Sequence, residues 1–157
     1  MRYIGSKQLL TPDILKLLEK KKLLNKNLTL LDAFCGTGSV SDALKDSFNI
    51  VVNDNLSWCT LYAKGRLCAR DCKFKKLGFD PFEFFNSNDE SIKGFVFKNY
   101  SPGGSKRMYF SPENAKRIDY FRAKIEDWKN DNLISEDEYC YLLACLIESV
   151  SHVSNTA

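Results

Sequence analysis

In the N-terminal third of the chain, the pattern of apolar positions changes from a helical spacing to short continuous apolar runs. Residues 11–22 carry leucine and isoleucine at helical intervals behind a Thr-Pro-Asp start and end in three lysines, which suits the negative C-terminal pole of a helix. Residues 28–33 and 50–52 are short and mostly apolar, as expected of buried strands. A short amphipathic stretch at 41–47 lies between them. This order predicts one βαβ unit with a parallel strand pair.

The rest of the chain alternates between helical periodicity and an irregular aromatic stretch. Residues 56–67 again have a helical spacing, whereas aromatic residues and lysines between 71 and 110 are interrupted by glycine and proline. The irregular stretch predicts loops with one or two short strands or turns. A helix is expected over 111–130, and Ser135 with Glu138 predicts a capping box for a last helix. Because that helix is apolar on nearly all sides, it needs cover on several of them.

The first predicted strand ends in Asp32 and runs into a turn that contains Gly36 and Gly38. Glycine allows positive φ and lets a ligand approach the main chain. The second strand ends at Asp54, sixteen residues after Gly38, where a nucleotide-binding unit keeps a carboxylate for ribose hydroxyls. The turn lacks the further glycine and lysine of pyrophosphate-binding motifs, which favours a smaller adenosine compound whose positive group would suit Asp32. An ordinary α/β turn is the alternative interpretation of the same pattern.

Composition narrows the class of protein only slightly. The 157 residues carry a formal net charge of +3 and are 44% hydrophobic, which fits a globular core and permits a nucleic-acid partner. Six cysteines lack the spacing of a zinc knuckle. Cys68 and Cys72 would share a helix face, but reduced, buried thiols in a cytoplasmic protein are the simpler interpretation. No apolar segment suits export or membrane insertion, so neither is expected.

Three motifs occur in order along the chain: RYIGSK, then DAFCGTGSV at the turn, then NDN after the second strand. Together they resemble the Dam-like adenine-specific (N6) DNA methyltransferases. The resemblance implies an α/β, Rossmann-like S-adenosylmethionine-dependent methyltransferase fold with an incomplete sheet, three-layered in its N-terminal half. It also implies a cofactor-binding part over 1–70 and a mostly helical target-recognition region over 71–157. The residues that it assigns to the cofactor S-adenosylmethionine are Tyr3, Gly5, Ser6, Lys7, Asp32, Phe34, Gly36, Gly38 and Asp54.

The resemblance extends beyond the cofactor-binding part. The stretch from Tyr100 to Asp119, with its Lys116-Arg117-Ile118-Asp119 end, and the segment 152–157 are similar to segments of this family. Aromatic and basic residues in and near the first stretch are the best candidates to contact double-stranded DNA, because cations meet phosphates and loop side chains reach base edges. These residues are Lys98, Tyr100, Lys106, Arg107 and Tyr109. A solvated surface loop is the alternative.

One element of the family is missing from this sequence. The Asp-Pro-Pro-Tyr tetrapeptide of these enzymes holds the amino group of a flipped adenine, yet none of the four prolines is next to another. Asp80-Pro81 is predicted to be a turn or a helix start instead. We therefore assign no catalytic residue, His152 included, and no metal site. The chain is expected to be the N-terminal part of such an enzyme and to be inactive by itself.

Three classes of function stay open on the sequence. The first is a site-specific DNA adenine-N6 methyltransferase of the restriction-modification type, represented by its cofactor-binding and DNA-recognition portion. The second is a non-catalytic DNA-binding or assembly subunit that needs a second chain carrying the catalytic motif. The third is a methyltransferase for RNA or a small molecule. An incomplete sheet also predicts an uncovered apolar face and self-association.

Overall fold

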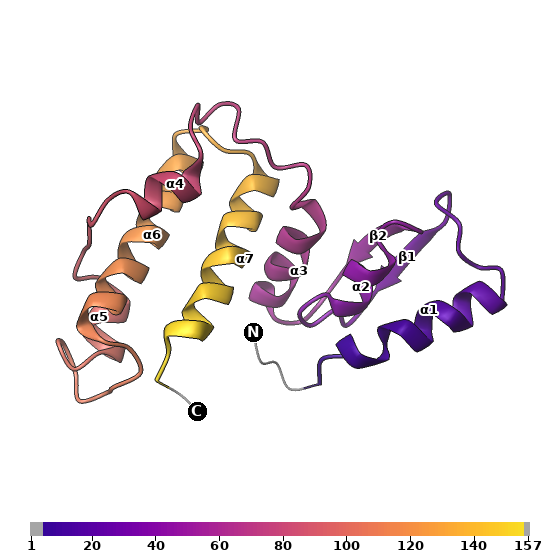
Figure 1. Ribbon diagram of the computed structural model, residues 1–157, viewed down its shortest axis with the longest axis horizontal. Helices are drawn as coiled ribbons and strands as arrows, with labels where there is room; N and C mark the ends of the chain where they lie inside the picture. Colours follow the sequence, from indigo (N-terminus) through magenta and orange to yellow (C-terminus); the bar gives the residue numbers. More distant parts are fainter. Residues whose placement is uncertain (1–4, 156–157) are drawn as a thin grey trace.

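The computed structural model describes residues 5–155, so Tyr3 lies outside the described residues. A strand pair with its helices forms one half of an elongated molecule, and a helical lobe forms the other (Figure 1). Among the described residues, no helix is both long and apolar enough to cross a membrane. The elements are a 3₁₀ turn η1 (Gln8–Leu10), α1 (Thr11–Lys20), β1 (Thr29–Asp32), α2 (Ser39–Leu44), β2 (Asn49–Val52), α3 (Ser57–Cys68), α4 (Pro81–Asn86), α5 (Phe95–Tyr100), α6 (Pro112–Asn130) and α7 (Glu136–Val153).

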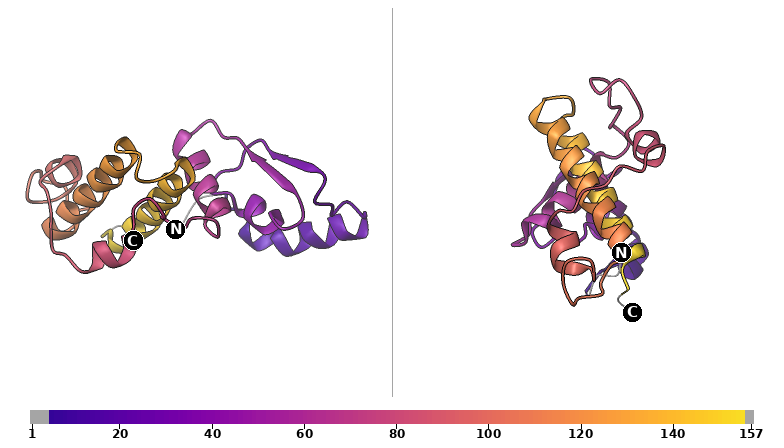
Figure 2. Two further views of the ribbon diagram at one scale, coloured as in Figure 1. Left: turned by 90° about the horizontal axis from the view of Figure 1, so that it is seen from above. Right: turned by 90° about the vertical axis from the view of Figure 1, so that its left-hand side faces the viewer.

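The two strands form the parallel pair that the sequence predicts. β1 and β2 pair from Thr29 with Asn49 to Asp32 with Val52, and α2 makes the crossover between them. The side of the pair that faces α2 is packed, and Leu44 of that helix is 1% exposed. Figure 2 shows α1 and α2 on one side of the strands. The described residues thus form a mixed α/β structure with a small parallel sheet.

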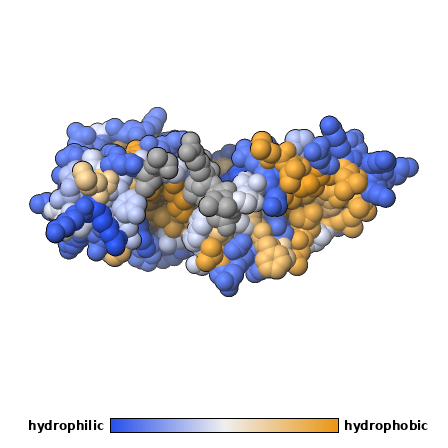
Figure 3. Space-filling model, turned by 90° about the horizontal axis from the view of Figure 1, so that it is seen from below, coloured by the Kyte–Doolittle hydropathy of each residue, from blue (hydrophilic) through white to orange (hydrophobic). Residues whose placement is uncertain are grey.

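The opposite face of the strand pair has no cover among the described residues, so the expected three-layer arrangement is wrong for this part of the chain. Leu31 of β1 and Val51 of β2 are 63% and 49% exposed. The physical reason is that the chain leaves β2 into α3 and then into the helical lobe, without crossing to the other face. Hydrophobic side chains gather over this half of the molecule (Figure 3). The prediction of an uncovered apolar face is therefore confirmed.

Replacing Leu31 and Val51 together by lysine is expected to leave the free energy of unfolding nearly unchanged, because both side chains already face solvent. The same change should lower the fluorescence of a hydrophobic dye and reduce any self-association seen by size-exclusion chromatography. Leu30→Lys is the matched control, since Leu30 lies on the half-buried side of β1 and should destabilise by about 2 kcal/mol or more. Equal destabilisation by both variants would contradict the assignment of the two faces.

The helical lobe is built around an aromatic core. Phe74, Phe85, Tyr120 and Trp128 are each less than a tenth exposed and pack with Ile125, Ile134 and Leu142. The rings of Phe85 and Trp128 lie 5.1 Å apart, and those of Phe85 and Phe121 lie 4.5 Å apart. Aromatic pairs at these distances contribute beyond the area that they bury. The aromatic-rich sequence of this region therefore forms a packed lobe of its own.

Two short helices occupy part of the stretch 71–110, where the sequence predicts loops with short strands or turns. No strand forms there, and α4 and α5 form instead. Asp80 caps α4, since its Oδ1 accepts from the backbone N–H of Phe82 at 2.7 Å and of Glu83 at 3.1 Å, so the predicted helix start is confirmed. The capping box of Ser135 and Glu138 at α7 is also confirmed. The strand prediction failed because six-residue helices are too short to show a helical period.

Helix α7 packs along α3 and so joins the helical lobe to the strand half (Figure 1). Gly65 of α3 sits against the backbone of Cys140, and a Cβ atom placed on Gly65 would lie 2.7 Å from the Cβ of Ala144. Real side chains do not approach so closely. Glycine at this position therefore sets a very close crossing between the two helices. Tyr62 of α3 also donates a hydrogen bond from its hydroxyl to Glu148 of α7.

Candidate functional site

The ends of β1 and β2 are held together by the turn between β1 and α2. The carboxylate of Asp54 accepts two backbone hydrogen bonds, from Gly36 N at 2.9 Å and from Leu56 N at 3.0 Å. The amide of Asn53 donates to the carbonyl of Ala33 at 3.0 Å. The bonds from Leu56 and Gly36 lower the pKa of Asp54 below its ordinary value. Asp54 is therefore ionised at neutral pH and already part of the turn.

Asp32 lies at the end of β1 and faces the same turn from its other end. Its Oδ2 accepts a hydrogen bond from the hydroxyl of Ser41 in α2 at 2.5 Å, and its backbone carbonyl accepts from the N–H of Asn53. Asp32 and Asp54 thus end neighbouring parallel strands, and both are bonded to the segment 33–41. Between them in the sequence, Phe34 is 89% exposed, whereas Cys35 is buried, and burial together with the charges of Asp32 and Asp54 raises the pKa of the Cys35 thiol to about 11. The two carboxylates lie at the carboxyl edge of the strand pair, where ligands bind in open α/β sheets.

Both glycines of the turn adopt the left-handed backbone conformation that the sequence predicts. The φ angles are 52° at Gly36 and 69° at Gly38. Gly38 has a second constraint, because a Cβ atom there would lie 2.7 Å from the Cβ of Ala63 in α3. Gly38 therefore serves helix packing as well as the turn, and its packing role alone does not require a ligand.

The described part of the N-terminal segment reaches this turn through Ser6. The hydroxyls of Ser6 and Ser39 are 3.1 Å apart, and both residues line a cavity of about 540 Å³ between α2, α3 and α7. Gly5 has a φ of 88°, and Lys7 is exposed at the start of η1. The structure thus brings Ser6 to the turn, while Lys7 makes no described contact with it.

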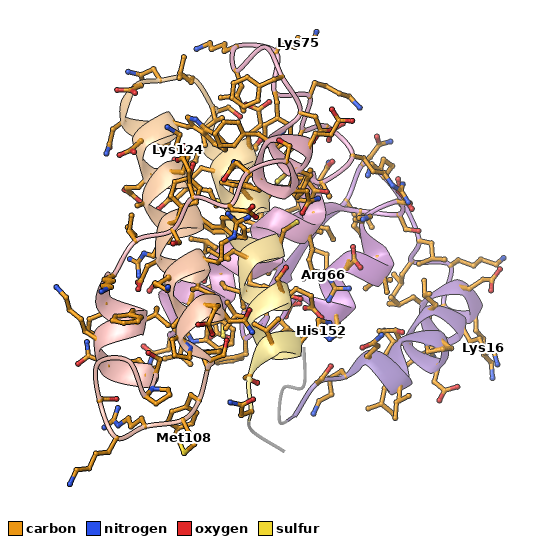
Figure 4. All side chains as sticks on the ribbon, turned by 60° about the vertical axis from the view of Figure 1, so that its left-hand side comes forward. Lys16, Arg66, Lys75, Met108, Lys124 and His152 are labelled. Carbon is orange, nitrogen blue, oxygen red and sulfur yellow. The ribbon has the colours of Figure 1, made fainter. Side chains whose placement is uncertain are left out.

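Arg66 in α3 is a residue of this region that the sequence analysis did not single out. Its guanidinium donates to the carbonyl of Thr37 at 3.2 Å and pairs with Asp42 at 2.6 Å, and Figure 4 shows it on the side of α3 that faces α2. The pairing, together with Lys45, lowers the pKa of Asp42 although burial alone would raise it. A single arginine in a helix gives no sequence signal for a contact with a turn 29 residues earlier.

The candidate DNA-contact residues gather on α5 and the loop after it, over residues 95–110. The Arg107 guanidinium lies 5.3 Å from the centre of the Tyr100 ring, and the Tyr100 and Tyr109 rings are 5.8 Å apart. Lys98 and Lys106 are exposed on the same element and loop. Met108, which the sequence analysis did not single out, is 71% exposed and lies on the outside of the loop (Figure 4). The five predicted residues therefore belong to one surface.

The Lys-Arg-Ile-Asp end of the family-like stretch has a structural role in the lobe. Asp119 is 7% exposed, and its carboxylate accepts from the N–H of Val96 at 2.9 Å and of Phe97 at 2.8 Å. Arg117 donates to the carbonyls of Phe85 and Glu90, at 2.6 and 2.8 Å. Asp119 thus caps α5. Arg117, in α6, holds α4 and the segment between α4 and α5 through the carbonyls of Phe85 and Glu90.

The remaining candidates do not form a centre for chemistry. Cys72 donates to the carbonyl of Cys68, and burial raises the pKa of Cys72 to about 12, which disfavours a reactive thiolate. Within residues 5–155, no group of three or more His, Cys, Asp or Glu side chains could hold a metal. His152 is 74% exposed and lies 3.7 Å from Glu148, in the last turn of α7.

Taken together, these elements define a mixed α/β protein in which a glycine turn and two carboxylates lie at the carboxyl edge of a small parallel sheet. The model of the family described as "D12 class N6 adenine-specific DNA methyltransferase" matches residues 3–157, and the chain belongs to that family.

The similar curated proteins are named as type II methyltransferases and modification methylases. The chain is 36% identical to type II methyltransferase M.FokI of Planomicrobium okeanokoites and 40% identical to modification methylase StsI of Streptococcus sanguinis; each match covers 99% of this chain and 25% of the relative. It is 36% identical to type II methyltransferase M.NlaIII of Neisseria lactamica over 80% of this chain and 37% of that protein. The chain thus spans about a quarter of the length of the first two. No solved structure matches.

Proposed function

We propose that this chain is the cofactor-binding and DNA-recognition portion of a site-specific DNA adenine-N6 methyltransferase of the restriction-modification type. The family assignment supports the reaction class, and the carboxylates at the ends of β1 and β2 support a nucleoside cofactor. The chain contains no Asp-Pro-Pro-Tyr, so methyl transfer would require that motif from elsewhere. The observation that carries the proposal is the placement of Asp32 and Asp54 around one glycine turn.

The residues at the turn fit S-adenosylmethionine. A carboxylate offers about four acceptor positions, and two at Asp54 are taken by backbone N–H groups, which leaves capacity for two ribose hydroxyls. Phe34 presents an exposed ring beside the turn that can stack on adenine. Asp32 supplies negative charge for the sulfonium or the amino group, and Gly5, Ser6 and Lys7 would approach the methionine end. When bound, the cofactor supplies the methyl group; these residues bind and orient it. A Rossmann-like arrangement of the complete enzyme is part of this proposal.

The basic and aromatic surface on residues 95–110 is proposed to contact double-stranded DNA. Lys98, Lys106 and Arg107 are exposed cations that can pair with phosphates, and the exposed parts of Tyr100 and Tyr109 can reach base edges. The stacking of Arg107 on Tyr100 limits the freedom of its guanidinium before DNA is bound. Pre-ordering of this kind reduces the entropy lost on binding.

Arg107→Ala is expected to weaken duplex binding about fivefold for all sequences. It should also lower the slope of log K against log salt concentration by about one, since one cation that neutralises a phosphate is lost. Fluorescence anisotropy with duplex DNA at several salt concentrations measures both quantities. Arg70→Ala is the charge-matched control, because Arg70 is 71% exposed and pairs only with the exposed Asp46 at 3.2 Å in the described part of the chain. Equal effects of the two substitutions would mean that this loop does not carry binding. Preference for RNA over duplex DNA would favour a different substrate class.

The uncovered face of the strand pair favours a second arrangement, in which another polypeptide completes the sheet. Parallel sheets are normally covered on both faces, and the exposed Leu31 and Val51 supply an apolar surface for such a contact. In this arrangement the chain is a DNA-binding or assembly subunit, and a partner carries the two-proline motif. Methylation that appears only when the two chains are mixed would support it, and activity of the chain alone would exclude it.

A further inference from the structure

Asn155 lies just past α7 and is bonded to the candidate DNA-contact loop. Its backbone N–H donates to the carbonyl of Tyr109 at 2.8 Å, and its side-chain Nδ2 donates to the carbonyl of Met108 at 2.9 Å. The two bonds join residues 46 and 47 positions apart in the sequence. Two donors of one residue thus hold two consecutive carbonyls, which fixes the direction of the loop backbone as well as its position.

Within residues 5–155, the other hydrogen bonds of the loop run to α5 or stay inside the loop. The N–H of Phe110 donates to the carbonyl of Tyr100 at 3.1 Å, and the hydroxyls of Ser101 and Ser105 bond carbonyls one turn earlier. Residues 106–109 are all exposed. In the part of the chain that the structure describes, Asn155 supplies the hydrogen bonds that join this exposed segment to another element. Without these two bonds, the exposed segment would be held only by the hydrogen bonds close to α5.

Core packing does not explain the position of Asn155, because the residue is exposed. A side-chain amide can donate to a carbonyl, whereas an aliphatic side chain cannot. Each bond is modest by itself, but a loop that is held in one place has already lost the conformational entropy that DNA binding would otherwise cost.

We infer that Asn155 is a positioning residue that fastens the loop of residues 101–110 to the end of α7 and so places Arg107 and Tyr109 for DNA. The inference rests on the proposed DNA-binding function for its second half. The fastening itself is a property of the free protein and can be measured without DNA. Asn155 touches neither a substrate nor a cofactor in this assignment; it acts through the loop.

Asn155→Ala tests the fastening with trypsin, which cleaves after Lys106 and Arg107 inside the loop. Loss of the Nδ2 bond should speed cleavage at these sites about threefold or more, the factor expected for one neutral hydrogen bond. The affinity for duplex DNA should fall by a similar factor while the salt dependence stays that of the unmodified chain, since no cation is removed. Asn130→Ala, at the opposite end of α6 and equally without charge change, is the matched control. Circular dichroism verifies that both variants are folded.

The outcomes separate the inference from the proposed function. Unchanged cleavage in Asn155→Ala would overturn the fastening whatever happens to DNA affinity. Faster cleavage with unchanged DNA affinity would overturn the positioning role. Should the unmodified chain bind no DNA, the proposed DNA contact fails, while the comparison of cleavage rates still decides whether Asn155 fastens the loop.

Discussion

Replacing Asp54 by asparagine should weaken S-adenosylmethionine binding about thirtyfold. The carboxylate is ionised and has acceptor capacity left for two ribose hydroxyls, and hydrogen bonds to a charged acceptor are stronger than those to a neutral one. At a cofactor concentration of about one hundred times Kd, binding stabilises the folded chain by about 2.7 kcal/mol, and most of this should vanish in the variant. Isothermal titration calorimetry gives Kd, and thermal unfolding with and without cofactor gives the stabilisation.

The free Asp54→Asn variant must be measured beside the bound one. An amide at this position cannot accept from both Gly36 and Leu56 with two oxygens, so the free protein should also unfold at a lower temperature. Asp46→Asn is the control for loss of a carboxylate, because Asp46 is 74% exposed and pairs only weakly with Arg70. An unchanged Kd in Asp54→Asn would exclude the ribose contact, and an equal loss in both variants would point to general electrostatics instead.

Asp119→Ala should lower the free energy of unfolding by about 3 kcal/mol. The substitution removes a buried acceptor and leaves the N–H groups of Val96 and Phe97 without their partner at the start of α5. Asp119→Asn keeps one acceptor oxygen and should lose about half as much. Urea unfolding followed by circular dichroism measures the three proteins under one set of conditions.

Asp127→Ala supplies the comparison within the same helix. Asp127 is exposed near the C-terminal end of α6, where a negative charge is not favoured by the helix dipole. Its removal should change the free energy of unfolding by less than about 0.5 kcal/mol. A loss in Asp119→Ala no larger than in Asp127→Ala would show that the cap of α5 contributes little.

The elements with strong local signals could be predicted from the sequence. The proline in the first turn of α1, the capping box at Ser135 and the glycine turn each depend on contacts within a few residues, and each is found. The expected N-cap at Thr11 is wrong, because α1 already includes Thr11 and its N-cap is Leu10. The placement of Asp32 and Asp54 at one edge of the sheet could also be predicted, because strand order alone brings them there, while their role in binding a nucleoside stays a prediction. Family membership followed from three motifs in sequence and is confirmed by the comparisons.

What the sequence could not supply are contacts between distant segments. The pairing of Arg66 with Asp42, the cap that Asp119 places on α5 and the bonds of Asn155 to the loop link residues 22 to 47 positions apart. No local pattern encodes such partners, because many exposed polar residues have the same neighbours in sequence. Similarly, α4 and α5 were missed since their six residues span fewer than two turns, and their stability comes from packing in the lobe.

The contact at Gly65 decides how the two halves of the molecule can move. A Cβ atom on Gly65 would lie against the carbonyl oxygen of Cys140 and 2.7 Å from the Cβ of Ala144, so α3 and α7 leave no room for a side chain where they cross. The two halves therefore cannot rotate about this contact without breaking its packing. The proposed cofactor site at the turn and the proposed DNA-contact loop would therefore belong to one rigid body. Under the proposed function, the spacing between the cofactor and the DNA-contact loop would be set by this packing before either ligand binds.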